Sequence, residues 1–225
     1  MRCNLVELLE VFGNDLMVVN AARVSYGKNK SIFDQRDEKL LKYLKEHKHI
    51  SVFRHPQLQF RISCPIYVER QLRKHEIGME VGTSPEPNSS INSISGRYID
   101  FSDSYTTIKE WRKQSTSSKQ GSEGLVEYQE SCSIIERQVI EFCKQAYQDL
   151  IDLGVSKEQA RTVLPLSLNT TFIWTGSLLS FLHLWGLRLK PDAQAETREV
   201  AQEMLDLVKA LEGNPFKYSL EAFGV

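Results

Sequence analysis

Apolar residues recur at helical spacing in several stretches of the chain. They do so in LMVVNAARVSYG, which ends at Gly27, and in KLLKYLKEHKH. The clearest pattern lies in residues 125–154, where no Gly or Pro interrupts the run before its end. Its one-sided apolar face comprises Ile135, Val139, Phe142, Cys143, Ala146, Leu150 and Leu153. This periodicity predicts a long amphipathic helix.

Strand-like alternation is clearest in QLQFRIS, where every second residue is apolar. Pro65 follows this stretch and predicts the start of a helix that continues through ERQLRKHE. Further helices are predicted in SKEQARTVLP, with Ser156 as its N-cap, at residues 177–185 and in AETREVAQEMLDLVKALEG. Residues 168–174 are predicted to form a strand or turn. The pattern predicts an α/β or α+β domain in which helices dominate.

Two polar tracts interrupt these elements. GMEVGTSPEPNSS at 78–90 and STSSKQGSEG at 115–124 have the Gly, Pro and Ser content of mobile loops. No internal repeat is visible. We therefore expect one domain over residues 1–225, with a flexible insertion at about 78–91.

The length and net charge of the chain restrict the kinds of partner that it is expected to bind. The 225 residues, 41% of them hydrophobic, are enough for a buried core, and the net charge of -1 gives no overall attraction to nucleic acid or anionic membranes. A phosphate site must therefore be a local cluster of cations. The acidic N-terminal segment does not resemble a signal peptide, and no apolar run approaches about 18 residues. We expect a soluble protein of the cytoplasm, or of the host cytoplasm if it is viral.

The cysteines offer neither a disulfide framework nor a nucleophile. Cys3, Cys64, Cys132 and Cys143 form no Cys-x-x-Cys pair and lie in apolar or acidic surroundings. His49 and His55 have no carboxylate or Cys at a useful spacing, so no metal site is expected. P-loop, G-x-S-x-G and G-x-G-x-x-G motifs are absent from the sequence. If the protein is an enzyme, a bound cofactor carries the difficult chemistry.

A candidate anion site begins in ERQLRKHE. On a helix starting at Pro65, Arg70 and Lys74 share one face, and Gln71 and His75 share the adjacent face. Two cations on one face repel each other unless an anion lies between them, although a solvated basic face fits these residues equally well. NSISGRY adds a third cation and several donors after the polar loop: Asn92, Ser93, Ser95, Gly96 and Arg97. Together these groups are suited to a nucleotide phosphate.

Two arginines stand among large apolar residues, Arg161 in EQARTVLPL and Arg188 in HLWGLRLKPDAQAE. The ordinary interpretation is an apolar stem on the protein surface with the guanidinium in water. The alternative is an arginine that points inward to bind an anion or a planar heterocycle. His183 on its own is interpreted as an ordinary core or helix-surface histidine.

NAARVSY, ERQLRKHE, SISGRY, QARTVLPLSL and LRLKPDAQAE, in that order, resemble the flavin-dependent thymidylate synthases over nearly the whole chain. The resemblance implies a mixed, twisted sheet surrounded by helices. At some positions this sequence departs from the family's pattern. The family's Arg-His-Arg triplet corresponds to Lys74, His75 and Glu76, with an insertion at MEVGTSPEPNSS before the serine that follows, Ser95. In GSLLSFLHL, Ser177, Leu179 and His183 stand where relatives often place Asn and Arg.

The resemblance implies reductive methylation of dUMP at C5, with methylenetetrahydrofolate as carbon donor, FAD as hydride carrier and NADPH as reductant. Arg188 corresponds to the arginine that contacts uracil and favours ionisation at N3, and Arg161 to one that binds dUMP from a neighbouring subunit. The implied dUMP ligands are Gln71, Lys74, Ser93, Ser95, Gly96, Arg97, Arg161 and Arg188. The implied FAD ligands are Ser51, Lys74, His75, Glu76, Asn92, Ser93 and His183. His49 and Tyr98 correspond to residues near the folate and flavin rings.

The family also implies a homotetramer with active sites between subunits. Two alternatives stay open at this point. One is a related enzyme that transfers a methyl or hydroxymethyl group to C5 of another pyrimidine nucleotide. The other is a non-catalytic nucleotide-binding homologue that has kept the fold.

Overall fold

The computed structural model describes residues 5–75, 91–99, 103–117 and 119–225. Within these residues, the main sheet has four strands in the order β1-β2-β6-β3. The strands are β1 (Leu5–Phe12), β2 (Gln57–Pro65), β6 (Asn169–Ser177) and β3 (Ile91–Ser93). Each neighbouring pair is antiparallel. The predicted fold class, an α/β domain with a sheet surrounded by helices, is confirmed.

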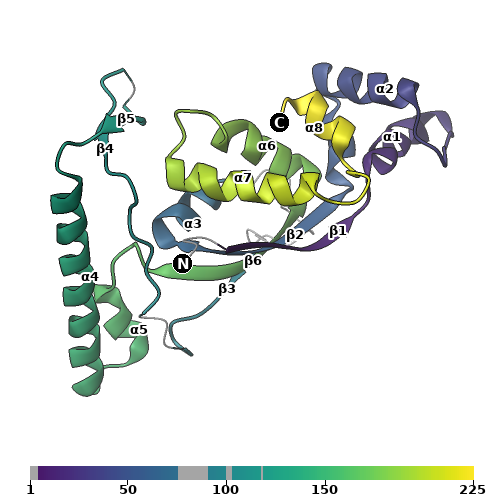
Figure 1. The fold of residues 1–225 in the computed structure, drawn as a ribbon. Coiled ribbons are helices and arrows are strands. Elements are labelled where there is room, and N and C mark those ends of the chain that lie inside the picture. Colours follow the sequence, from purple (N-terminus) through teal and green to yellow (C-terminus); the bar gives the residue numbers. More distant parts are fainter. Residues whose placement is uncertain (1–4, 76–90, 100–102, 118) are drawn as a thin grey trace.

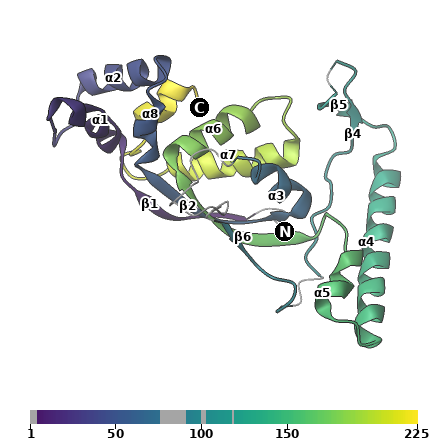
Figure 2. The ribbon, with the colours of Figure 1, turned by 180° about the vertical axis from the view of Figure 1, so that it is seen from behind.

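Helices α3 (Ile66–Leu72), α6 (Leu178–Arg188) and α7 (Ala195–Lys209) lie along one face of the sheet (Figure 1). At one end of the molecule stand α1 (Asp15–Arg23), α2 (Gln35–Glu46) and α8 (Lys217–Phe223). At the other end stand α4 (Gln129–Asp152), α5 (Lys157–Ala160) and a hairpin of β4 (Arg112–Gln114) and β5 (Ser122–Leu125). Figure 2 shows the same arrangement from behind. Short 3-10 helices are η1 (Val24–Tyr26), η2 (Ile50–Arg54) and η3 (Arg161–Val163).

The core forms where the two central strands face the helices. Leu58, Phe60 and Ile62 of β2 are fully buried, as the alternating pattern predicts. Phe60 pairs across the sheet with Trp174 of β6, and both rings pack edge-on against Phe181 of α6, at centroid distances of 5.1 and 5.3 Å. Burying each such aromatic side chain contributes on the order of 2 kcal/mol. These contacts fix α6, and with it Arg188 at its end, over the sheet.

The two ends of the chain pack together through Asp15. This buried residue starts α1, and its carboxylate accepts hydrogen bonds from the backbone N–H of Tyr218 at 2.7 Å and of Ser219 at 3.1 Å. Burial raises the pKa of Asp15 to about 6, and the hydrogen bonds from Ser219 and Tyr218 only partly oppose that rise. The N-terminal and C-terminal segments therefore belong to one packed body.

Most helix predictions are confirmed, including the long helix as α4 and the helix after residue 177 as α6. The helix after Pro65 was predicted too long. Because α3 ends at Leu72, Lys74 lies beyond it, and the shared helical face of Arg70 and Lys74 is not formed. β1, β3 and α8 were not predicted. The tract at 115–124 is not only loop, because it contributes Ser122 to β5 and Glu123 accepts hydrogen bonds from Thr116.

The apolar face of α4 is largely exposed. Ile135, Val139, Phe142 and Leu153 are between 48% and 81% exposed. The long helix packs against α5 and η3 but does not lie on the sheet. The predicted insertion at 78–90 falls outside the described residues. Among the helices that the structure describes, none has the length and apolar character needed to cross a membrane.

Candidate functional site

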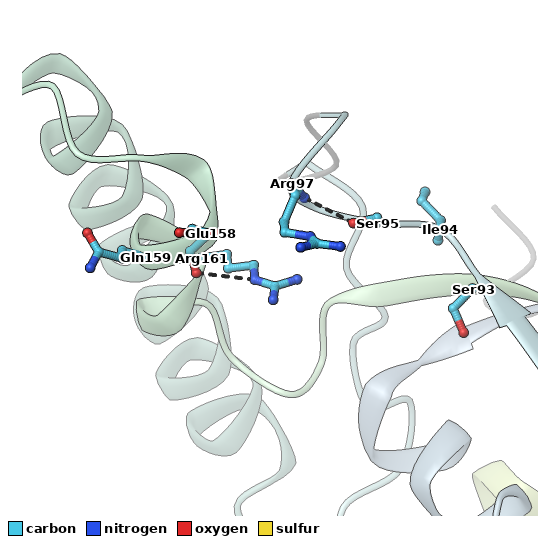
Figure 3. A pocket seen from close by; sticks show the side chains of 7 residues that line it. All are labelled: Ser93, Ile94, Ser95, Arg97, Glu158, Gln159 and Arg161. Carbon is cyan, nitrogen blue, oxygen red and sulfur yellow. Dashed lines mark hydrogen bonds between the residues drawn. The ribbon is translucent and has the colours of Figure 1, made fainter. Parts of the chain in front are cut away.

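An open pocket of about 640 Å³ lies between the end of β3 and the α5–η3 segment. Figure 3 shows the Arg97 and Arg161 guanidinium groups reaching into it from opposite sides. Its lining residues are Ser93, Ile94, Ser95, Arg97, Glu158, Gln159 and Arg161. We call this the arginine pocket. It brings together four of the predicted nucleotide ligands: Ser93, Ser95, Arg97 and Arg161.

A tight turn after β3 places Arg97. The backbone N–H of Tyr98 and of Ile99 donate to the carbonyl oxygen of Ser95 at 3.0 and 3.2 Å, and the Arg97 N–H donates to the Ser95 hydroxyl at 3.3 Å. Gly96 is buried inside this turn. The turn therefore directs the Arg97 side chain away from the sheet and into the arginine pocket (Figure 3).

Arg161 reaches the pocket from η3, directly after α5. Its Nε donates to the carbonyl oxygen of Glu158 at 3.4 Å, a long contact that restrains it weakly. Within the described part of the chain, neither Arg161 nor Arg97 has a carboxylate oxygen within 4.0 Å. Two such guanidinium groups in one pocket favour an anionic ligand with several acceptor oxygens, such as a phosphate.

A second group of polar residues lies where α6 ends beside α3. Arg188 donates from Nε to His75 Nε2 at 2.8 Å and from a terminal nitrogen to the Gln71 carbonyl oxygen at 3.3 Å. His183, on the same helix, is exposed, and its ring stands edge-on to that of His75 with 6.2 Å between centroids. Arg188 is therefore held inward rather than projecting freely into water.

His75 is 5% exposed, and its protonation state decides what it can do. Burial, followed by the positive charge of Arg188 and the nearby His183, lowers the pKa of His75 to about 4. The imidazole is therefore neutral near pH 7 and accepts the hydrogen bond from Arg188. A neutral acceptor leaves the positive charge of Arg188 available to a ligand.

Arg73 connects this group to the arginine pocket. Its guanidinium donates to the Ser93 hydroxyl at 2.6 Å and forms an ion pair with Glu69. Ser93 lies in β3 and also lines the pocket. The end of α3 is thereby tied to the strand that leads into Arg97.

Other predicted ligands lie outside both groups. Lys74, Asn92 and Tyr98 are exposed, Tyr98 by 75%, although the Arg97 guanidinium lies 5.4 Å from the centre of the Tyr98 ring. Ser51 and His49 are exposed in or beside η2, where His49 stacks at 6.4 Å on Tyr43. Glu76 lies outside the described residues.

Sequence reasoning missed several residues that support these groups. Arg73 was passed over in favour of its neighbour Lys74, and Glu158 and Gln159 of the pocket wall were not singled out. Gln194 and Thr197 both contact the side chain of Gln71. Gln194 lies close to Arg188 in the quoted LRLKPDAQAE. This closeness in sequence was the signal that could have identified Gln194.

Among the described cysteines, Cys64 is not an activated thiol. Cys64 is fully buried, and burial followed by the charge of Glu69 raises the pKa of its thiol to about 12. Cys132 and Cys143 are partly exposed residues of α4. The chemistry that fits these side chains is recognition of an anion and a polar ring by arginines, not attack by a thiolate.

The structure is thus an α/β fold that carries an open, arginine-lined pocket and, at the end of α6, an inward arginine. The family model described as "Thymidylate synthase complementing protein" matches residues 7–212. The chain belongs to this family, the flavin-dependent thymidylate synthases.

Individual relatives agree with the family model. The chain is 38% identical over 208 residues to a flavin-dependent thymidylate synthase of Kosmotoga olearia, covering 91% of this chain and 85% of that one. It is 36% identical over 204 residues to the Thermus thermophilus protein of the same name, covering 91% and 71%. Among solved structures, the UMP/dUMP methylase PolB from Streptomyces cacaoi bound with 5-Br dUMP is similar at a TM-score of 0.83 and 26% identity, covering 98% and 94%.

Proposed function

We propose that this protein methylates C5 of dUMP reductively to form dTMP. The observation that carries the proposal is the pairing, in one chain, of the arginine pocket with an inward Arg188 beside Gln71. The names of its relatives and the 5-Br dUMP bound by the similar methylase support the same substrate. A bound FAD would supply the hydride, with NADPH as its reductant and methylenetetrahydrofolate as the carbon donor.

The three arginines have two different roles in this proposal. Arg97 and Arg161 bind the phosphate, together with Ser95 and the backbone near Gly96. Arg188 contacts the uracil ring and stabilises the negative charge that develops at N3, because a guanidinium stays charged even in a partly buried site. Gln71 and Lys74 complete the nucleotide site. His75 keeps the Arg188 guanidinium oriented.

Polar residues from three segments fit a flavin: Lys74 shortly after α3, Asn92 and Ser93 of β3, and His183 of α6. They present cationic or neutral polar groups suited to a diphosphate, whereas the one carboxylate among the implied FAD ligands, Glu76, lies outside the described residues. His75 has Nε2 engaged by Arg188, so only Nδ1 is left for a flavin. Ser51 contributes from η2. We propose that His49 and Tyr98 lie near the folate and flavin rings when these are bound.

We also propose that residues 1–225 form one catalytic domain that assembles into a homotetramer. The single core and the packing of Asp15 against α8 support one domain. The exposed apolar face of α4 supports self-association. In this assembly Arg97 and Arg161 of one subunit bind the phosphate of a nucleotide whose ring meets Arg188 of another.

A second candidate function is methylation of UMP. The similar methylase is described for both UMP and dUMP and was also solved with 5-Br UMP. A non-catalytic nucleotide-binding protein is the third possibility, although it leaves the inward Arg188 without a purpose.

One experiment separates these candidates. The purified protein is supplied with FAD, its visible spectrum is recorded before and after anaerobic NADPH, and turnover is measured with dUMP, UMP and dCMP. We expect a flavin band that bleaches faster with dUMP, and dTMP as the product. Turnover of UMP alone would replace the proposed substrate, and a colourless protein that binds nucleotide without turnover would show that the enzyme proposal is wrong.

A further inference from the structure

The side-chain amide of Gln71 is held at both ends. Its Oε1 accepts from the Thr197 hydroxyl at 3.0 Å, and its Nε2 donates to Oε1 of Gln194. Thr197 is fully buried, so the oxygen side of the amide faces the protein interior. Since a carboxamide can be turned end for end, only its partners decide which way it points.

These partners belong to a series of hydrogen bonds in which each donor and acceptor is fixed by the next group. We call the series the relay; it comprises Arg112, Glu196, Gln194, Gln71 and Thr197. Arg112 of β4 forms an ion pair with Glu196 at 2.6 Å, and Gln194 Nε2 donates to the other carboxylate oxygen at 3.0 Å. Burial opposes ionisation of Glu196, but hydrogen bonds from Arg112 and Gln194 outweigh it and lower the pKa of this carboxyl. An ionised carboxylate only accepts, so Gln194 must turn its nitrogen to Glu196 and its oxygen to Gln71. Gln71 must then present its nitrogen.

Among the residues that the structure describes, Gln194 is the one acceptor for Gln71 Nε2, so one hydrogen of this amide is left over. The backbone carbonyl of the same residue accepts from Arg188, so Gln71 lies beside the inward arginine. A ligand atom that meets Nε2 is favoured if it accepts a hydrogen bond. An amino group at that position meets a donor instead, and one of the two groups loses its partner.

We propose that Gln194, Glu196, Thr197 and Arg112 are positioning residues that lock Gln71 as a hydrogen-bond donor, so that the site selects nucleotides presenting an acceptor oxygen there. The proposal deepens the proposed function, on which it rests for the identity of the ligand. The oxygen belongs either to the C4 carbonyl of the uracil ring, where cytosine carries an amino group, or to the phosphate. In the first case the relay discriminates uracil from cytosine.

The test uses binding of dUMP, dCMP and deoxyuridine to the full chain supplied with FAD, measured by calorimetry. Glu196→Gln replaces a group that only accepts by one that also donates, so neither Gln194 nor Gln71 is forced into one orientation. Gln194→Leu keeps the Arg112–Glu196 ion pair but removes the requirement on Gln71. Glu199→Gln is the matched control, because it removes a carboxylate from the same helix whose ion pair, to Lys109 at 4.0 Å, is exposed.

We expect both relay variants to lower the ratio of dUMP affinity to dCMP affinity about ten-fold or more if the oxygen is the C4 carbonyl. If it is a phosphate oxygen, dUMP and dCMP weaken together while deoxyuridine is unaffected. The Glu199→Gln variant keeps the wild-type values in both cases. Melting temperatures identify a variant that has merely lost stability, and Gln194→Leu remains informative if Glu196→Gln does not fold.

Either pattern supports a positioning role and tells which oxygen is recognised. The inference is overturned, with the proposed function intact, if the wild-type protein binds dUMP and both relay variants match Glu199→Gln for all three ligands. Failure of the wild-type protein to bind any of these ligands would instead overturn the proposed function together with this inference.

Discussion

The two halves of the candidate site differ in how far the chain has already organised them. Arg188 and Gln71 are restrained by buried neighbours, His75 at 5% exposure and Thr197 at 0%. Arg97 and Arg161 instead are exposed in an open pocket. Side chains fixed in advance lose little conformational entropy when a ligand binds, whereas free arginines must be ordered by it. In our proposal the fold prepares recognition of the ring, and charge attracts the phosphate.

The largest effect that this comparison predicts is at Arg188. We expect Arg188→Ala to lower kcat by about 100-fold or more, because losing a positioned electrostatic contact raises the barrier by ~3 kcal/mol. Arg188→Lys keeps the charge but loses the planar fork, so we expect only partial recovery. Steady-state turnover and the melting temperature are the measurements. Turnover of Arg188→Ala within a few-fold of the wild type would show that this arginine has another role.

Next in size are the arginines of the pocket. We expect Arg97→Ala and Arg161→Ala each to weaken dUMP binding about 10-fold to 100-fold, because a charge-assisted hydrogen bond contributes about 1.5–3 kcal/mol. Deoxyuridine, which lacks the phosphate, should bind both variants and the wild type equally. Arg36→Ala, an exposed arginine on α2, is the matched control. Equal weakening of deoxyuridine would place these arginines on the ring or the sugar instead.

The regular parts of this fold were accessible from sequence because they follow from local periodicity. Alternation identified β2, one-sided apolar spacing identified α4, and helix start and stop signals identified α6. The same rules predicted a longer α3. In the structure the residues after Leu72 are engaged by distant partners, Arg73 by Ser93 and His75 by Arg188, and such tertiary contacts are not encoded in helical periodicity.

The candidate site shows the same division. Arg97, Arg161 and Arg188 were predicted because charged residues among apolar or glycine-containing segments are unusual, and the family resemblance gave each a role. The support for Gln71 was not predicted, since Gln194 and Thr197 stand 123 and 126 positions away in the sequence. A single sequence gives no signal for which of its many amides and hydroxyls will meet at such separations.

The third prediction concerns the loss of folding stability at acid pH. The pKa of His75 is lowered from 6.5 to about 4 on folding, so the unfolded chain binds more protons between these values. The stability that comes from keeping His75 neutral is therefore complete above about pH 6.5 and is lost as the pH falls toward 4. After allowance for solvent screening, the loss is at most about 2 kcal/mol.

Urea unfolding of the wild type and of His75→Gln at pH 7 and pH 4.5 measures this loss. Asp15 acts in the opposite direction, because its pKa is raised to about 6 and its contribution grows as the pH falls. Only the difference between wild type and variant therefore reports on His75. His55→Gln, at an exposed histidine outside the candidate site, is the control for the loss of an imidazole. Identical pH dependence in His75→Gln and the wild type would mean that His75 does not hold Arg188 as a neutral acceptor.

The smallest predicted effect is at Lys74. Replacing this residue tests whether it belongs to the organised half of the site, with Arg188 and Gln71, or to the open half. Its backbone is held, since its N–H donates to the Gln71 carbonyl at 3.3 Å, but its side chain is exposed. We expect Lys74→Ala to leave the free energy of unfolding within about 0.5 kcal/mol of the wild type and to weaken dUMP binding only a few-fold.

That weakening should disappear at 1 M salt, where the screening length is about 3 Å and an exposed point charge acts weakly. The effects of Arg97→Ala and Arg161→Ala should persist in part, because a guanidinium also forms directional hydrogen bonds. If Lys74→Ala instead matched Arg161→Ala at both salt concentrations, Lys74 would belong to a rigid phosphate site, and the contrast between an organised and an open half would be wrong.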